Sequence, residues 1–372
     1  MILQLRNLRV LAAPVLIIAL ALILLPTQAE PVQALPGTDG RPLASTTFNG
    51  IPYAVSPTGP LRLRPPQRLP SGQTDRIDAT GAAAACPQLL LSPADATIVG
   101  KIGGKLLQTH FLSNLAGQED CLTVSIQRPA NTTANAKLPV LFWIFGGGFA
   151  FGTTSTYDGS SMVAEGVANN QPFIFVAVNY RLNGLGFLPG AEVLKEGSAN
   201  VGLLDQRLAL EWMALFDGDT TYRGKPLFRA AIFNSGVGIP SEPMDSPKGQ
   251  AVCDKVVAAA GCSSAADTLA CLRGLDYHAY HKAVTGSFNS AFSFYGSKIS
   301  FLPRPDGKAL PVSSEEAAAA GRYFAVPVIV GNQEDEGTLF PLFQRSIKSD
   351  AEPVDYFAGH YFANASKAQL TD

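Results

Sequence analysis

The sequence lacks the signatures of several large classes of protein. None of its five cysteines forms a C-x-x-C pair with histidines at zinc spacing, so no metal site is predicted. The G-x-G-x-x-G fingerprint of a dinucleotide site is absent after the early apolar segments, and no cofactor is predicted. A formal net charge of −2 gives no electrostatic case for a nucleic-acid partner. Fixed-period internal repeats are also missing, which argues against a solenoid.

A basic N-terminus is followed by an apolar run that is short for a membrane span. Arg6 and Arg9 precede the run Val10–Leu25, which contains a proline, and Ala29 offers a small residue before a cut. A spanning helix needs about 20 apolar residues. We therefore predict a secretory signal peptide over residues 1–29 and a secreted protein, with an uncleaved membrane anchor as the alternative.

The cysteines and two glycosylation sequons fit a secretory route. In an oxidising compartment, five cysteines are most simply counted as two disulfides and one remaining thiol. Asn131 and Asn364 each begin the acceptor pattern for N-glycosylation. Such triplets also arise by chance, so they add modest support.

Apolar segments with the composition of strands alternate with helical patterns. Continuous β-branched and aromatic runs are typical of strands buried on both faces. They occur at 138–148 and 172–182. The segments 227–236 and 325–337 each have the pattern of a strand followed by a turn, and an alternating run occurs at 122–129. Between them, Leu204, Leu208 and Trp212 lie four residues apart, as on one face of a helix. The alternation predicts an α/β fold with a mostly parallel central sheet and helices on both faces.

Candidate site residues are those that directly follow the apolar runs, because ligands of such sheets bind beyond the carboxyl ends of the strands. They are Gly146–Phe149, Asn179–Arg181, Ser235 and Glu334–Gly337. Three consecutive glycines let backbone N–H groups approach a ligand oxygen, as an oxyanion hole requires, although three glycines alone also suit a plain turn. Asn179 and Arg181 are expected to be structural, with Glu119 or Asp120 as the partner of the arginine.

Seven segments, in order along the chain, carry a resemblance to a known family. They are FNGIPYA (48–54), EDCLTVSIQRP (119–129), FWIFGGGFAFG (142–152), VNYRLNGLGFL (178–188), NVGLLDQRLALEW (200–212), LFRAAIFNSG (227–236) and GNQEDEGTLF (331–340). With these segments the chain resembles the type-B carboxylesterase/lipase family, and FLPRPDG (301–307) is similar to its secreted fungal lipases and esterases. The resemblance implies an α/β-hydrolase domain over residues 30–372, truncated, that acts on small-molecule or lipid esters.

The resemblance also assigns roles to individual residues. It implies that Gly147 and Gly148 are oxyanion-hole donors and that Glu336 is the acid that orients a catalytic histidine. It implies the disulfides Cys86–Cys121 and Cys262–Cys271. In lipase members the first disulfide closes an apolar lid that a lipid–water interface can cover; an ordinary surface loop is the alternative.

The chain departs from the family where the nucleophile belongs. No serine stands in a G-x-S-x-G elbow, and Ser235 has Phe233 in place of the first glycine. A few dozen residues that family members place between Trp212 and Met213, including the elbow, are missing.

None of the four histidines fits the triad. His110 lies in the lid-like segment, and His278 and His281 are a weak candidate for a metal pair. His360 flanks a helical pattern, and members of the family place their histidine beyond Asp372.

Two hypotheses follow. The first is an ester hydrolase of the Ser-His-Glu type whose gene model has lost a segment, so that the chain as written is inactive. The second is a non-catalytic binding or adhesion homologue. In family members the missing residues include a central strand of the sheet, and deleting it leaves buried N–H and C=O groups unpaired, at about 1–3 kcal/mol each. We therefore expect the chain to fold poorly and to show no esterase activity.

Overall fold

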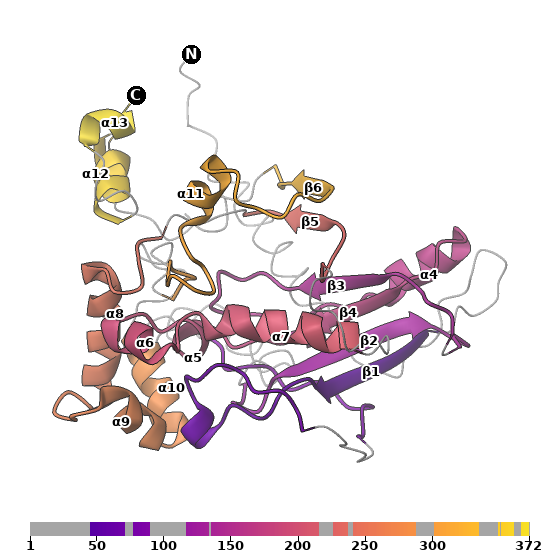
Figure 1. Ribbon diagram of the computed structural model, residues 1–372, viewed down its shortest axis with the longest axis horizontal. Helices are drawn as coiled ribbons and strands as arrows, with labels where there is room; N and C mark the ends of the chain where they lie inside the picture. Colours follow the sequence, from indigo (N-terminus) through magenta and orange to yellow (C-terminus); the bar gives the residue numbers. More distant parts are fainter. Residues whose placement is uncertain are drawn as a thin grey trace, which may run out of the picture.

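Two β-sheets with helices around them make up the part of the chain that the computed structural model describes (Figure 1). That part comprises residues 45–70, 77–89, 117–133, 135–215, 226–236, 241–287, 301–334, 349, 351–360 and 366–371. Within these residues, no helix is both long and apolar enough to cross a membrane.

The larger sheet has four strands in the order β1-β2-β4-β3. Its strands are β1 (Ser45–Pro52), β2 (Thr123–Pro129), β3 (Val140–Ile144) and β4 (Ile174–Val178). β1 pairs antiparallel with β2, β2 pairs antiparallel with β4, and β3 pairs parallel with β4. The sheet is therefore mixed, and its parallel part lies at the β3 edge.

The smaller sheet consists of two parallel strands, β5 (Ala231–Asn234) and β6 (Val328–Gly331). In Figure 1, β5 lies beyond β3, on the side away from β4, and the arrowheads of β3 and β5 point the same way. Among the described residues, no strand pairing joins the two sheets.

Both faces of β4 are covered by helices. Side chains of a strand alternate between its faces, and those of β4 meet α7 (Val201–Leu215) on one side and α4 (Ser160–Ala168) on the other. The cluster on the α7 side includes Val176, Val178, Leu208 and Ala209. The cluster on the α4 side includes Phe175, Ala177 and Val163. This layering confirms the predicted α/β fold class.

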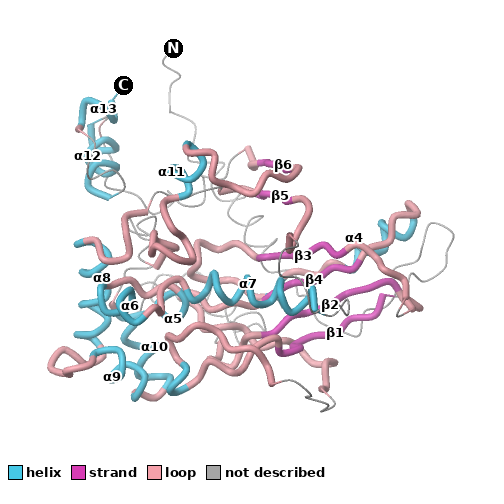
Figure 2. The backbone as a smooth tube through the Cα atoms, in the orientation of Figure 1, coloured by secondary structure: helices cyan, strands magenta, loops and turns pink. Residues whose placement is uncertain are grey.

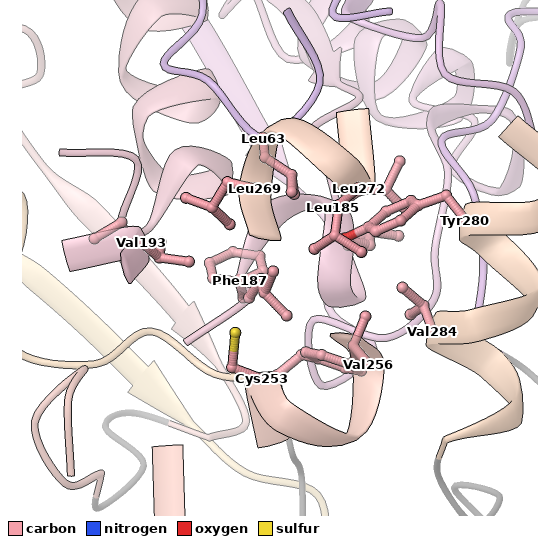
Figure 3. Close-up of a cluster of buried hydrophobic side chains, with 14 of the residues drawn as sticks. Leu63, Leu185, Phe187, Val193, Cys253, Val256, Leu269, Leu272, Tyr280 and Val284 are labelled. Atoms are coloured by element: carbon pink, nitrogen blue, oxygen red, sulfur yellow. The ribbon is translucent and has the colours of Figure 1, made fainter. Parts of the chain in front are cut away.

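The helices beyond the sheet form the largest apolar core. Figure 2 shows α6, α8, α9 and α10 gathered past one end of the strands. The helices outside the sheet layers are α5 (Asn183–Gly186), α6 (Ala191–Glu196), α8 (Pro247–Ala259), α9 (Thr268–Gly274), α10 (Tyr277–Gly286), α11 (Ser314–Ala319), α12 (Ala351–His360) and α13 (Lys367–Thr371). In Figure 3, Phe187, Cys253 and Leu272 meet in this core with side chains from several of these helices.

Three of the apolar strands are less buried than their sequences predict. Val140 and Ile144 of β3 are 46% and 40% exposed, and Ile232 of β5 is 55% exposed. In β6, Val328, Ile329 and Val330 are all more than half exposed. The physical reason is the missing pairing: among the described residues, β3 has a single partner strand and β5–β6 stand as a pair.

Candidate active site

A glycine loop follows β3 directly, at the position that the sequence predicts for the oxyanion donors. The φ angle is +128° at Gly147 and +61° at Gly148, in the region that favours glycine. A Cβ added to Gly147 would lie 2.1 Å from the carbonyl oxygen of Phe151. The loop can therefore take this shape only with glycine at position 147.

The backbone N–H groups of this loop fall into two sets, those that close the turn and those with no acceptor among the described residues. The N–H groups of Ala150 and Phe151 donate to the carbonyl of Gly147, at N···O distances of 3.0 and 3.3 Å, and close the turn. Among the described residues, the N–H groups of Gly147 and Gly148 donate to no acceptor. Two adjacent free N–H groups on a constrained turn are suited to hold a ligand oxygen.

Gln88 holds the far end of the glycine loop. Its side chain is buried, its Oε1 accepts from the N–H of Gly152 at 2.7 Å, and its Nε2 donates to the carbonyl of Gly152 at 3.0 Å. The N–H of the next residue, Leu89, donates to the carbonyl of Ala150 at 2.8 Å. The segment just after Cys86 thus lies along the loop and fixes it. Sequence reasoning missed Gln88, because a glutamine after Cys-Pro has no signal of its own.

Asn183 fixes the middle of the loop from α5. Its backbone N–H donates to the carbonyl of Phe149 at 2.7 Å, and its side-chain Nδ2 donates to the carbonyl of Pro87 at 2.7 Å. Asn183 is fully buried and has a φ of +46°. Its two bonds connect the glycine loop, α5 and the segment at Pro87.

Aromatic rings pack behind the loop. The rings of Phe145 and Tyr180 stack at 4.7 Å, and those of Phe149 and Phe187 meet at 4.9 Å. The hydroxyl of Tyr180 donates to the carbonyl of Phe145 at 2.9 Å. Burial raises the pKa of Tyr180 far above its ordinary value, so this hydroxyl stays protonated and remains a donor.

Arg181 and Asn179 are structural, as predicted, but the predicted partner of Arg181 is wrong. Its guanidinium forms a two-pronged ion pair with Asp205 of α7, at 2.8 and 2.7 Å. Both side chains are almost completely buried. Asn179 accepts from the N–H of Thr154 at 3.0 Å. Neither side chain is positioned to react with a substrate.

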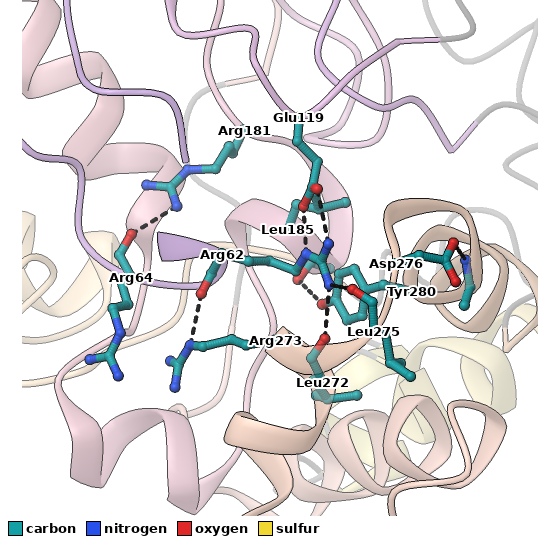
Figure 4. Close-up of polar contacts among 12 residues, drawn as sticks. Arg62, Arg64, Glu119, Arg181, Leu185, Leu272, Arg273, Leu275, Asp276 and Tyr280 are labelled. Carbon is teal, nitrogen blue, oxygen red and sulfur yellow. Dashed lines mark hydrogen bonds and ion pairs between the residues drawn. The ribbon is translucent and has the colours of Figure 1, made fainter. Parts of the chain in front are cut away.

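Glu119, the first partner predicted for Arg181, pairs with Arg62 instead (Figure 4). Arg62 donates to both carboxylate oxygens of Glu119, at 2.5 and 2.9 Å. It also donates to the carbonyls of Leu272 and Leu275, between α9 and α10. With four acceptors around one buried guanidinium, Arg62 ties the segment after β1 to the helical core.

Both disulfides that the resemblance implies are present. Cys86–Cys121 has an S–S distance of 2.02 Å, and Cys262–Cys271 has one of 2.06 Å. Cys253 is a free, buried thiol, and burial raises its pKa to about 12. A protonated, enclosed thiol is a poor nucleophile, so Cys253 belongs to the core.

The predicted acid and one predicted glycosylation site cannot be placed. Glu336 and Asn364 lie outside the described residues. Nearby, β6 ends at Gly331, and Glu334 is exposed. Asn131 is described: it is exposed, with a φ of +61°, two residues after the end of β2.

Ser235 follows β5 and has a φ of +73°. Its N–H donates to the carbonyl of Gly331 at 2.8 Å, so the pairing of β5 with β6 extends to this residue. A left-handed φ is one property of a nucleophile elbow, but the G-x-S-x-G glycines are not present around Ser235.

The histidines do not assemble a catalytic or metal centre in the described part of the chain. His281 of α10 is partly buried, its Nε2 lies 3.0 Å from the carbonyl oxygen of Gln88, and burial lowers its pKa. His278 lies one turn earlier, His110 is outside the described residues, and His360 ends α12. Among the described residues, no three His, Cys, Asp or Glu side chains are grouped as metal ligands.

Helix α7 runs without a break across Trp212 and Met213 and ends at Leu215. Both residues pack against the apolar cluster between α7 and the sheet. The residues before and after the Trp212–Met213 junction therefore form one continuous helix. β5 begins sixteen positions after α7 ends, at Ala231.

Comparison with known proteins identifies the family. The model of the carboxylesterase family matches residues 35–221 and 220–364. The chain is 48% identical to the secreted triacylglycerol lipase LIP1 of Gibberella zeae over 356 residues, which cover 87% of this chain and 60% of that protein. It is 29% identical to the inactive carboxylesterase-like protein VdtD of Byssochlamys spectabilis over 354 residues, which cover 86% of this chain and 58% of that protein.

A solved structure agrees with this. The crystal structure of Aspergillus niger EstA is similar with a TM-score of 0.68 and 29% sequence identity, covering 91% of this chain and 64% of that one. The chain spans about three fifths of the length of the two curated relatives. Part of the difference is internal: 87% of 372 residues is about 324, so about 32 of the 356 matched positions of the Gibberella zeae lipase have no counterpart here. The chain belongs to the carboxylesterase family.

Proposed function

We propose that this 372-residue chain has the scaffold and the oxyanion donors of an ester hydrolase but does not hydrolyse esters itself. One observation carries the proposal: no serine in the sequence stands in a G-x-S-x-G elbow. The glycine loop, by contrast, has constrained N–H groups at Gly147 and Gly148 that face no internal acceptor. The chain thus has part of the machinery and lacks the group that attacks the ester.

In a form of the protein that contains the elbow, ester hydrolysis proceeds in two steps through an acyl-enzyme. The serine Oγ attacks the ester carbonyl, a histidine takes its proton, and the alcohol leaves with that proton. The amides of Gly147 and Gly148 stabilise the oxyanion, and Glu336 keeps the histidine in the required tautomer. Water then cleaves the acyl-enzyme and regenerates the serine. The substrates are small-molecule or lipid esters, in keeping with the triacylglycerol lipase relative.

A second candidate function is non-catalytic binding on the same scaffold. It is favoured by the relative VdtD, which is an inactive carboxylesterase-like protein. A binding homologue has to be a stable protein, whereas a chain that has lost a central strand has to be unstable. Cooperative unfolding in urea therefore favours the binding function, and a broad, non-cooperative loss of structure favours a lost segment.

Hydrolysis of p-nitrophenyl butyrate by the purified chain tests the main proposal. We expect the rate to equal that of buffer, and a fluorophosphonate probe to leave the chain unlabelled. Turnover above the buffer rate overturns the proposal. In that case the variant Ser235→Ala decides whether the serine nearest to an elbow is responsible: loss of turnover assigns the reaction to it.

Secretion and glycosylation are part of the proposal. The basic and apolar N-terminal segment, the two disulfides and a secreted relative support an extracellular protein. Asn131 is exposed in the turn after β2, as the acceptor of a glycan has to be. Expression in a eukaryotic secretory host should give a chain in the medium whose mass falls on treatment with peptide N-glycosidase. The variant Asn131→Gln should lose the mass difference contributed by this site.

A further inference from the structure

Helix α10 contacts both of the segments that support the glycine loop. The Nε2 atom of His281, in the second turn of α10, lies 3.0 Å from the carbonyl oxygen of Gln88. Tyr280, whose side chain enters the apolar core (Figure 3), donates its hydroxyl to the carbonyl of Gly184 in α5 at 2.8 Å. Because Gln88 and α5 each bond with the glycine loop, α10 is connected to the loop through both of its supports.

The contact with Gln88 defines the chemical form of His281. A carbonyl oxygen only accepts hydrogen bonds, so Nε2 carries the hydrogen and the neutral ring has its lone pair on Nδ1. Tyr277, one turn earlier on the same face, stacks on the ring of His281 with centroids 5.6 Å apart. The hydroxyl of Tyr277 donates to the carbonyl of Gly117 at 3.3 Å. The orientation of the imidazole is therefore set on two sides.

Two hydrogen-bonding steps lead from His281 to the glycine loop. His281 bonds with the backbone of Gln88, and the side chain of Gln88 bonds with both backbone groups of Gly152 at 2.7 and 3.0 Å. The N–H of the next residue, Leu89, donates to the carbonyl of Ala150 at 2.8 Å. A displacement of Gln88 therefore changes the same short turn that carries the free N–H groups.

The surroundings of His281 favour its neutral form. Burial lowers the pKa of His281; the carbonyl of Gln88 opposes this effect, and the charge of His278 adds to it. The other titratable groups nearby, among the described residues, are the stacked Tyr277 and Glu119, which acts on Tyr277 and is itself neutralised in its ion pair. Because the pKa of His281 is lower in the folded chain than its ordinary 6.5, its contribution is complete above that pH. It is lost as the pH falls through the lower, folded pKa.

We propose that His281 is a positioning residue for the oxyanion donors: it fixes the backbone of Gln88, and Gln88 fixes the turn that carries the N–H groups of Gly147 and Gly148. The inference rests on the proposed function, which assigns these two N–H groups to a ligand oxygen. Protonation does not remove the Nε2–H of His281. It charges a partly buried ring, which gains by moving toward water, and the contact with Gln88 opens. The placement of the donors is therefore sensitive to pH.

Amide hydrogen exchange of Gly152, in the full chain labelled with [15N]glycine, tests the proposal. The N–H of Gly152 donates to Gln88, so its protection factor measures how firmly Gln88 is held against the turn. The reference is the N–H of Gly190, which donates to the carbonyl of Met244 at 3.0 Å and reports opening of the core. The ratio of the two protection factors separates a local effect from unfolding of the chain.

Three variants assign the effect to the N–H donor of His281. His281→Leu removes the donor and should lower the ratio about threefold to tenfold, as expected for one hydrogen bond. His281→Gln keeps an N–H donor on a side chain that does not titrate, and should restore most of the ratio. His278→Leu is the matched control, an exposed position on the same helix, and should change nothing at neutral pH. Equal losses from His281→Leu and His278→Leu overturn the proposal.

The pH profile separates positioning from packing. Between about pH 7.5 and about pH 5 the ratio should fall in the unsubstituted chain and in His278→Leu, and it should stay level in His281→Gln. If His281→Leu unfolds the core, so that Gly190 loses its protection too, the profiles of the unsubstituted chain and His281→Gln decide alone. A level profile in the unsubstituted chain, or no protection of Gly152 in it, overturns the proposal.

Titration with butyrate, the acid that p-nitrophenyl butyrate releases, separates this inference from the proposed function. The readout is the shift of the Gly147 and Gly148 N–H signals. If butyrate leaves these signals in place while Gly152 protection depends on His281, the donor role in the proposed function is contradicted and the positioning role is supported. If butyrate shifts the signals while His281→Leu leaves Gly152 protected, the donors are supported and the positioning role is overturned.

Discussion

Replacing Asp205 by alanine tests how far the interior of this chain depends on a single ion pair. The carboxylate of Asp205 is completely buried and accepts three hydrogen bonds from Arg181: from Nε at 2.8 Å, from Nη2 at 2.7 Å and from the backbone N–H at 3.0 Å. Alanine leaves the guanidinium buried with no counter-charge. Breaking a buried pair from one side costs about 3–5 kcal/mol.

That loss is large against the total stability of a domain, which is about 5–15 kcal/mol. The assay is urea unfolding followed by circular dichroism. We expect the midpoint of Asp205→Ala to fall by at least about a fifth, and the transition to disappear if the stability of the unsubstituted chain is near 5 kcal/mol. The matched control is Arg207→Ala on the same helix, where the arginine side chain is 70% exposed in its ion pair with Glu211. Its effect should be about 0.5 kcal/mol or less.

A double variant separates the charge from the packing. Arg181→Met combined with Asp205→Leu removes both charges, so it should be more stable than Asp205→Ala alone. It still leaves the carbonyl of Arg64 without the donor it has from Arg181, so some loss remains. If Asp205→Ala costs no more than Arg207→Ala, the ion pair does not hold α7 to the segment after β4, and the reasoning is refuted.

Three further predictions concern the loop, the disulfide and one helix cap. Removing the Cys86–Cys121 disulfide by alanine at both positions should lower the free energy of unfolding by about 4 kcal/mol, from the loop entropy of a separation of 35, as measured by urea unfolding. Gly147→Ala should cost about 1–3 kcal/mol because its φ is +128°, whereas Gly146→Ala, where an added Cβ meets nothing, should be nearly neutral; equal effects contradict the loop geometry. At the start of α10 the N–H of Ala279 donates to the carboxylate of Asp276 and lowers the pKa of that carboxylate. The ionised carboxylate therefore stabilises the fold above the pKa that Asp276 has in the unfolded chain, and this stabilisation is lost as pH falls through its lower pKa in the folded chain. The thermal midpoint of Asp276→Asn should therefore fall less than that of the unsubstituted chain between about pH 6 and about pH 3.

The strands and the main helix could be predicted because their signals are local. Runs of β-branched and aromatic residues predicted β3, β4, β5 and β6, and the spacing of Leu204, Leu208 and Trp212 predicted α7. Their burial could not be predicted in the same way. The same apolar composition is buried in β4 and exposed in β6, because burial depends on neighbours that lie far away in the sequence.

The glycine loop was predictable as a loop, but its supports were not. Three glycines after a strand indicate a loop whose backbone can approach a ligand closely. The positive φ angles of Gly147 and Gly148 agree with such a loop. Gln88 lies 64 positions from Gly152 and bonds with it only in the folded chain. The partner predicted for Arg181, Glu119 or Asp120, was wrong for the same reason: Arg62 pairs with Glu119, and Arg181 pairs with Asp205.

The exposed pair β5–β6 has a consequence for the fate of this chain in a cell. Parallel apolar strands with open edges are templates for pairing with other chains, and natural proteins normally protect such edges. Chaperones and proteases recognise chains that expose apolar segments, and they set how much of an unstable protein is present. We expect this polypeptide to be governed by cellular quality control, so that its abundance, more than its chemistry, decides whether it has any effect.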